Sequence, residues 1–269
     1  MSRSLLNACG WALLAVLVCP AELAVLAEGQ VDWPRAQPPG LKSKPSYFEV
    51  DNLLGSQGKV VLEVFPGEQK DLDDLSGPPR PAKMCIAKSP LHSCYVARAR
   101  DTNFAQEARA SVVDLGEGRA GILFQANYVG INDAWKLVAI LGLDFHGRLI
   151  NLLPVVVISM QDHFRVWHEP QLSTADLITA ANYVWKLQPP HEETHFASHH
   201  YQISTYAFCA NTGRYLLVDR FTTRRKFNGL DGENHPGERV LNATLPQVQS
   251  RLLEDSGSRK NTCRKLDEK

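Results

Sequence analysis

YQISTYAFCANTGRYLLVDRFT, residues 201–222, has the pattern of a β-hairpin. Alternate residues of Tyr201–Cys209 form one face, which is typical of a strand that turns one side toward a core. Asn211 favours a turn, and Gly213 can take the positive φ that closes a three-residue hairpin loop. The chain returns over Tyr215–Thr222, so the sequence predicts two antiparallel strands joined by a tight turn.

Six more strand patterns precede this hairpin. They are rich in β-branched, aromatic and other apolar residues, and turn residues separate most of them at the short spacing of antiparallel sheets. One of them contains Pro154, which indicates a bend or an edge position. The segments are Lys59–Phe65, Ala120–Tyr128, Trp135–Phe145, Leu149–Ile158, Phe164–Trp167 and Leu177–Leu187. The predicted fold class is mostly β, an antiparallel sheet domain of the sandwich, barrel or partial-propeller kind.

One short helix is expected near the C-terminus, over Leu245–Glu254. Leu245, Val248 and Leu252 fall on one face at helical spacing, and Pro246 suits the first turn. This helix would cover an open end of the sheet. The expected organisation is a signal peptide at 1–27, a flexible proline-rich linker at 28–45, a single β-rich domain at 46–254 and a polar basic tail at 255–269.

The first residues have the three parts of an export signal. Arg3 gives a positive start, an apolar run follows over Trp11–Val18, and Ala24–Ala27 offers small residues for cleavage. The apolar run is shorter than the roughly 20 residues that span a bilayer, so cleavage is favoured over an anchor. We therefore expect a secreted or periplasmic protein with no membrane span after cleavage.

Four cysteines remain after this cleavage: Cys85, Cys94, Cys209 and Cys263. An even count in an exported chain predicts disulfides, and three pairings are formally possible. The preferred pairs are Cys85–Cys94, which closes a short loop around Pro90, and Cys209–Cys263, which would hold the tail.

Charge is balanced, with 29 basic and 29 acidic residues. Removal of the signal takes away one charge of each sign, Arg3 and Glu22. Nucleic acids and anionic membranes select proteins with a basic face, so neither is expected as the main partner. An unknown protein or glycan outside the cytoplasm is expected instead.

His191-Glu-Glu-Thr-His195 matches the H-E-x-x-H motif of zinc hydrolases. On a helix the two histidines would bind zinc, Glu192 would activate the bound water as the catalytic base, and His199 could supply a third nitrogen. Pro189-Pro190 precedes the motif and a strand pattern follows it, so at most one helical turn fits. The context favours a histidine-rich solvated loop, with no cofactor, over a zinc site.

Three functional classes follow. A non-enzymatic, extracytoplasmic binding or inhibitor-like module is preferred, because a rigid β scaffold is combined with neutral charge and no nucleophile motif. The alternatives are a zinc-dependent hydrolase built on His191, Glu192 and His195, and a structural component of an envelope assembly.

Overall fold

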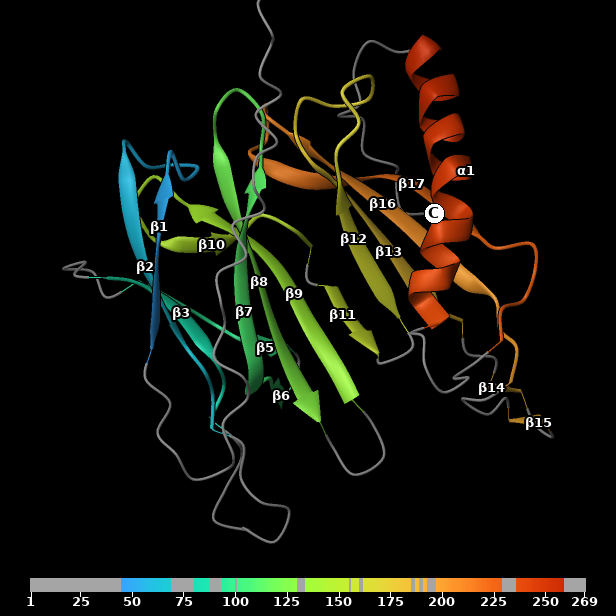
Figure 1. The fold of residues 1–269 in the computed structure, drawn as a ribbon, viewed down its shortest axis with the longest axis horizontal. Helices are drawn as coiled ribbons and strands as arrows, with labels where there is room; N and C mark the ends of the chain where they lie inside the picture. The colour runs from blue at the N-terminus through green and yellow to red at the C-terminus, as the bar shows by residue number, and fades with distance from the viewer. Residues whose placement is uncertain are drawn as a thin grey trace, which may run out of the picture. The chain divides into compact units, whose positions relative to one another are not determined.

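The computed structural model describes residues 45–68, 80–87, 93–99, 101–129, 134–154, 156–159, 162–184, 187–188, 191–192, 197–228 and 236–258. The elements in these residues are strands, with one helix at the C-terminal end, α1 (Pro236–Ser258). The predicted fold class, a mostly β protein of antiparallel sheets with a C-terminal helix, is confirmed (Figure 1). Among the described strands every sheet has two edges, so none of these sheets closes on itself.

The first sheet, called here the N-terminal sheet, has four antiparallel strands in chain order. Its strands are β1 (Ser46–Asp51), β2 (Lys59–Phe65), β3 (Lys83–Ile86) and β4 (Cys94–Val96). The predicted strand Lys59–Phe65 coincides with β2. A small antiparallel pair, β5 (Arg98–Ala99) and β6 (Thr102–Asn103), follows this sheet in the chain.

The second sheet, called the central sheet, has five antiparallel strands. Its strands are β7 (Gln106–Asp114), β8 (Ala120–Val129), β9 (Ala134–Leu143), β10 (Leu149–Asn151) and β11 (Val156–Ser159). Both β10 and β11 pair with β9, along successive parts of it, and Pro154 lies between the two. The bend predicted at Pro154 is therefore confirmed, and its physical cause is the missing N–H of proline.

The third sheet, called the C-terminal sheet, contains the hairpin at 201–222. Its strands are β12 (His163–Trp167), β13 (Leu177–Tyr183), β16 (Tyr201–Cys209) and β17 (Arg214–Thr222). Gly213 has φ 65° and donates its N–H to the carbonyl of Cys209 at 2.8 Å, so the predicted hairpin and the positive φ of Gly213 are confirmed. The expected three-residue loop is wrong, because Cys209 pairs with Arg214 and the loop has four residues, 210–213. A two-stranded pair, β14 (Leu187–Gln188) and β15 (His191–Glu192), lies in the chain between β13 and β16.

The central sheet is covered on both faces, as alternate side chains of β8 show. Ile122 and Phe124 of β8 pack in one core cluster with residues of the N-terminal sheet. Leu123, between them, packs in a second cluster with residues of the C-terminal sheet. Successive side chains of a strand point to opposite faces. A strand buried on both sides therefore reads as a continuous apolar run, as residues 120–124 do, and not as a clean alternation.

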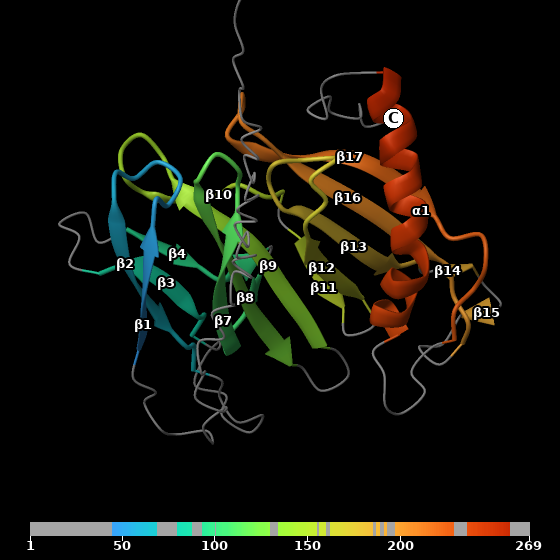
Figure 2. The same cartoon turned by 45° about the horizontal axis from the view of Figure 1, so that its top comes forward.

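Helix α1 packs on the outer face of the C-terminal sheet (Figure 2). Its apolar contacts are Val240, Leu241, Val248 and Leu252. The predicted start at Leu245 is wrong, because the helix begins at Pro236 and Pro246 lies inside it. Proline lacks one helical hydrogen bond, but the apolar residues before and after it both bury against the sheet, and this packing continues the helix through it.

Helix α1 ends at Ser258, within the stretch expected to be a polar tail. No helix among the described residues combines the length and the hydropathy that a membrane span requires.

Candidate binding surface at the β9–β10 turn

The turn between β9 and β10 is held rigidly by one carboxylate. Asp144 Oδ1 accepts hydrogen bonds from the backbone N–H groups of His146 and Arg148, both at 2.9 Å. Its Oδ2 accepts from Arg148 Nε at 2.9 Å. Gly147 has φ 75° and donates its N–H to the carbonyl of Asp144 at 2.9 Å. The result is a tight hairpin loop with glycine at the left-handed position, the conformation that hairpins of this length favour.

The hydrogen bonds of this turn also decide its charge. The backbone N–H of Arg148 is the main cause that lowers the pKa of Asp144, and the Arg148 guanidinium adds to the effect. Asp144 is therefore ionised at neutral pH and paired with Arg148, whose Nη2 lies 2.8 Å from Oδ2. The tip of the turn carries one balanced ion pair.

Phe145 stands at the tip of this turn with 91% of its surface exposed. Its ring centroid lies 3.7 Å from that of His146, so the two rings form one aromatic projection. Burying a phenylalanine side chain gains about 1.5–3 kcal/mol, and this gain is not realised within the chain. Single exposed apolar residues are common, so the exposure acquires meaning from the fixed turn and from the surface beside it.

An open cleft of about 690 Å³ lies beside the tip. It is lined by Ser93, Cys94, His146, Arg148, Leu149 and Ile150. These residues come from β4 and the residue before it, from β10 and from the turn, so the cleft lies between an edge strand of the N-terminal sheet and an edge strand of the central sheet. The tip and the cleft share His146 and Arg148, which places them next to each other.

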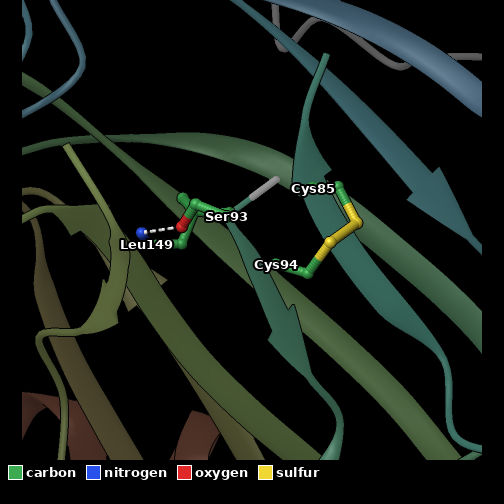
Figure 3. Close-up of a disulfide and its surroundings, with 4 residues drawn as sticks. All are labelled: Cys85, Ser93, Cys94 and Leu149. Atoms are coloured by element: carbon green, nitrogen blue, oxygen red, sulfur yellow. Dashed lines mark hydrogen bonds between the residues drawn. A yellow bond between two sulfur atoms is a disulfide. The ribbon is translucent and has the colours of Figure 1, made fainter. Parts of the chain in front are cut away.

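A disulfide and a hydrogen bond hold the strands beside the cleft together (Figure 3). Cys85 and Cys94 lie opposite each other on β3 and β4 and form a disulfide, which confirms the first predicted pair. The buried hydroxyl Ser93 Oγ accepts a hydrogen bond from the backbone N–H of Leu149 at 2.7 Å. The first link ties β4 to β3, and the second ties the start of β4 to β10. The cleft is therefore built from braced strands.

Only one cysteine of the second predicted disulfide lies within the described residues. Cys209 ends β16, is fully buried and is disulfide-bonded. Cys263 lies outside the described residues, so the pairing Cys209–Cys263 stays a prediction.

The histidine motif does not belong to this surface. It lies in the chain between β13 and β16 of the C-terminal sheet. His191 and Glu192 form β15, where His191 is opposite Gln188 and Glu192 is opposite Leu187. Two extended residues are not the helix that would turn His191 and His195 toward one metal ion. His195 lies outside the described residues.

His199, the third candidate ligand, is part of the core. Only 1% of its surface is exposed, and its Nε2 is hydrogen-bonded to the hydroxyl of Tyr183. The two rings pack at a centroid distance of 3.9 Å. Its backbone N–H and carbonyl both bond to Phe227 at 2.8 Å. In the part of the chain that the structure describes, no three His, Cys, Asp or Glu side chains are placed to hold a metal ion.

A second polar cluster joins the central and C-terminal sheets. Asp176 accepts the backbone N–H of Asp114 at 2.9 Å through Oδ2, and its own N–H donates to the Asp114 carbonyl at 2.8 Å. Tyr215 Oη donates to the Asp176 carbonyl at 3.2 Å, and His168 Nδ1 lies 3.3 Å from Asp176 Oδ1. Burial raises the pKa of Asp176. These contacts account for the cluster as a connection between two sheets.

The predicted strand Trp135–Phe145 is too long, because β9 ends at Leu143 and Phe145 lies in the turn after it. The segment Asp144-Phe-His-Gly147 contains the signal: an Asp that can cap a turn, a Gly for positive φ, and between them an aromatic residue where polar residues are usual. Compared with known proteins, the chain matches no family model, no curated protein sequence and no solved structure.

Proposed function

We propose that the protein is a non-enzymatic binding module outside the cytoplasm, and that it binds a protein partner through the tip at Phe145. The observation that carries the proposal is the 91% exposure of Phe145 on a turn whose backbone is fixed by Asp144. A fixed turn loses little conformational entropy on binding, so less of the burial energy of the ring is lost to ordering the loop. Aromatic anchors of this kind are typical of interface hot spots.

The location rests on two features. The sequence predicts a cleavable export signal at 1–27, and disulfides such as Cys85–Cys94 persist in oxidising compartments. Both support a site of action in the periplasm or outside the cell.

A protein partner is favoured over a glycan by the chemistry of the cleft. Sugar sites present several polar groups to the hydroxyls in addition to an aromatic ring. Here Ser93 Oγ already accepts a hydrogen bond from Leu149, and Arg148 is paired with Asp144. What remains for a partner is chiefly the exposed ring of Phe145.

Site-specific photo-crosslinking tests this proposal in the cells that produce the protein. A benzophenone amino acid replaces Phe145 in the full chain, and in the matched control it replaces Tyr47, an aromatic residue of β1 that is 59% exposed. We expect a discrete cross-linked protein from position 145 and none from position 47. The species identified by mass spectrometry should then bind the purified chain, and Phe145→Ala should weaken that binding by about tenfold or more.

Two results would contradict the proposal. One is the absence of any cross-link at position 145, and the other is the same cross-linked species from both positions.

The zinc-hydrolase alternative gains no support from the described residues. His191 and Glu192 are in a strand and His199 is bonded to Tyr183. Metal analysis after dialysis decides it: one equivalent of zinc that is lost in a His191→Ala/His195→Ala variant would revive this alternative.

A further inference from the structure

We propose that the central sheet carries a second binding site, in which Arg109, Asn127 and Lys136 hold a carboxylate group of a ligand. These three residues are called here the basic cluster. Lys136 lies near the start of β9 and Phe145 follows the end of this strand, so the site is separate from the tip.

The register of β7, β8 and β9 puts the cluster on one face of the central sheet. Asn127 and Lys136 lie directly opposite each other on β8 and β9. Arg109 lies opposite Gln125, two residues before Asn127 on β8. Residues directly opposite each other, and residues two apart in a strand, point to the same side of a sheet. One face of the sheet therefore presents the side chains of Arg109, Gln125, Asn127 and Lys136.

This face changes from apolar to polar along its strands. Leu123 of β8 and Val138 of β9 belong to the core cluster between the central and C-terminal sheets. Lys136, two residues before Val138, is half-buried, and Ile158 lies opposite it on β11 and is buried. The Arg109 side chain keeps 59% of its surface exposed. The cluster therefore lies where the core meets the solvent, and a ligand can reach it.

The cluster has more positive than negative charge. Glu107 supplies a carboxylate, whose Oε2 accepts a hydrogen bond from Asn127 Nδ2 at 2.7 Å and lies 3.7 Å from Arg109 Nη2. Lys136 lacks such a partner, because the described residues give its ammonium neither a hydrogen bond nor an ion pair. Two cations beside one carboxylate leave one positive charge in excess.

The surroundings of Lys136 disfavour its charge in the absence of a ligand. Burial lowers the pKa of Lys136, and the nearby charge of Arg109 lowers it further. Glu107 acts in the opposite direction, with the smallest of the three effects. A half-buried cation beside a second cation is unfavourable unless an anion offsets both. A ligand carboxylate held by both groups supplies this charge and accepts charge-assisted hydrogen bonds from them.

The backbone beside the cluster is strained. Glu107 has φ 44°, in the left-handed region that residues with a side chain rarely adopt. A β-bulge lies at the same place, because Glu107 and Ala108 of β7 together lie opposite Ala126 of β8. Bulges redirect side chains, and both bulges and backbone strain are frequent at functional sites. The strain therefore supports a binding role for the cluster.

The excess of one positive charge favours a carboxylate over more highly charged anions. A phosphate group carries about 1.5–2 negative charges at neutral pH, more than the cluster balances. A nucleic acid requires a broad basic face, whereas the whole chain has a formal net charge of zero. The carboxylate belongs to a free organic acid or to an acidic residue of a partner protein, and the cluster recognises the same group in both.

Titration of the purified, disulfide-bonded chain with acetate tests the site by NMR, with chloride keeping the ionic strength constant. We expect saturable shifts of the backbone amide signals of Arg109, Asn127 and Lys136, with a dissociation constant on the order of 1 mM. Lys136→Met and Arg109→Gln should each weaken acetate binding by about tenfold or more. The control Lys59→Met should leave it unchanged, because the Lys59 ammonium is already paired with Glu49 at 2.7 Å.

Thermal unfolding separates a binding role of Lys136 from a structural one. Without ligand, Lys136→Met should be at least as stable as the native chain, because it removes a half-buried charge that has no ion-pair partner among the described residues. A saturating concentration of acetate should raise the Tm of the native chain and not that of the variant. If Lys136→Met does not fold, Arg109→Gln takes its place in this comparison.

A short peptide with blocked ends and one glutamate identifies the source of the carboxylate. Tighter binding than acetate assigns a partner protein, and equal or weaker binding assigns a free organic acid. Three results would overturn the site: no saturable shifts with acetate, the same acetate affinity in the native chain and in both variants of the cluster, and tighter binding of inorganic phosphate than of acetate.

Discussion

Gly67 follows β2, at a point where three backbone segments meet. A Cβ at this position would lie 2.3 Å from the Arg80 carbonyl oxygen and 2.5 Å from Ala105 Cα. Backbone atoms cannot move aside as the end of a flexible side chain can. The Gly67 N–H also donates to the Ala105 carbonyl at 2.9 Å, so a shift here breaks a hydrogen bond.

We therefore expect Gly67→Ala to lower the free energy of unfolding by about 3 kcal/mol. Urea denaturation measures the change. The matched control is Gly58→Ala, where φ is 91° and nothing lies within 4 Å of the new Cβ. In the control, the free energy of unfolding should fall only by the strain of a positive φ, about 1 kcal/mol. Equal losses in the two variants would show that crowding at Gly67 is unimportant.

Asp162 is a buried carboxyl group whose pKa is raised. Burial is the main cause, and hydrogen bonds from the backbone N–H groups of Tyr183 and Ser159 offset part of it. The folded protein therefore holds a proton on Asp162 at a pH where the unfolded chain has released it. By linkage, the contribution of this group to stability increases as the pH falls toward 3.8, the ordinary pKa of an aspartate.

We expect the native chain to gain stability relative to Asp162→Asn as the pH falls from about 7 to about 4. Denaturant unfolding at both values measures it. Asp144→Asn is the control of opposite sign, because hydrogen bonds lower the pKa of Asp144. The stability that ionised Asp144 contributes is present above pH 3.8, the ordinary pKa of an aspartate, and is lost as the pH falls below it. Parallel pH dependences in the two variants would contradict the assignment.

At the scale of elements, helix α1 is fixed to the C-terminal sheet by one ion pair in addition to its apolar face. Arg251 donates from Nε and Nη2 to both carboxylate oxygens of Asp219, the closest at 2.7 Å. The Asp219 side chain is only 7% exposed, while that of Arg251 is 42% exposed. Loss of the guanidinium would leave a buried carboxylate with fewer partners.

We expect Arg251→Ala to cost about 1–2 kcal/mol in the free energy of unfolding, a value moderated by the solvent around Arg251. The control is Lys59→Ala, which breaks an ion pair with Glu49 whose side chains are 54% and 58% exposed. Exposed pairs contribute little to stability, so Lys59→Ala should lower the free energy of unfolding much less than Arg251→Ala does. If chemical denaturation gave the two variants the same stability, the pair would not anchor the helix.

How far an element could be predicted depended on how local its signals are. The hairpin of β16 and β17 was predicted because Gly213 and the alternating strands carry its information within 22 residues. The start of α1 was not, since a proline inside a sequence favours a helix start. Only the sheet beneath Val240 and Leu241 shows why the helix extends back to Pro236.

At the scale of the whole molecule, the predicted export signal has a direct test. We expect the protein recovered outside the cytoplasm to begin near Glu28, because the peptidase cleaves after the small residues at Ala24–Ala27. N-terminal sequencing measures this. In the control Leu14→Arg, a charge interrupts the apolar run, so the uncleaved precursor should accumulate in the cell. An exported chain that still begins at its first residues would contradict the signal.

The sequence alone predicted the hairpin and most strands of the central and C-terminal sheets, and it favoured the pairing of Cys85 with Cys94, because each depends on residues close together in the chain. It missed β1, β3 and β7. The tertiary structure decided the stacking of three sheets under one helix, the burial of His199 beside Tyr183 and the exposure of Phe145. These depend on contacts between segments far apart in the sequence. Periodicity shows which residues share one face of a strand or helix. Only packing decides whether that face is buried in a core or stays exposed to a partner.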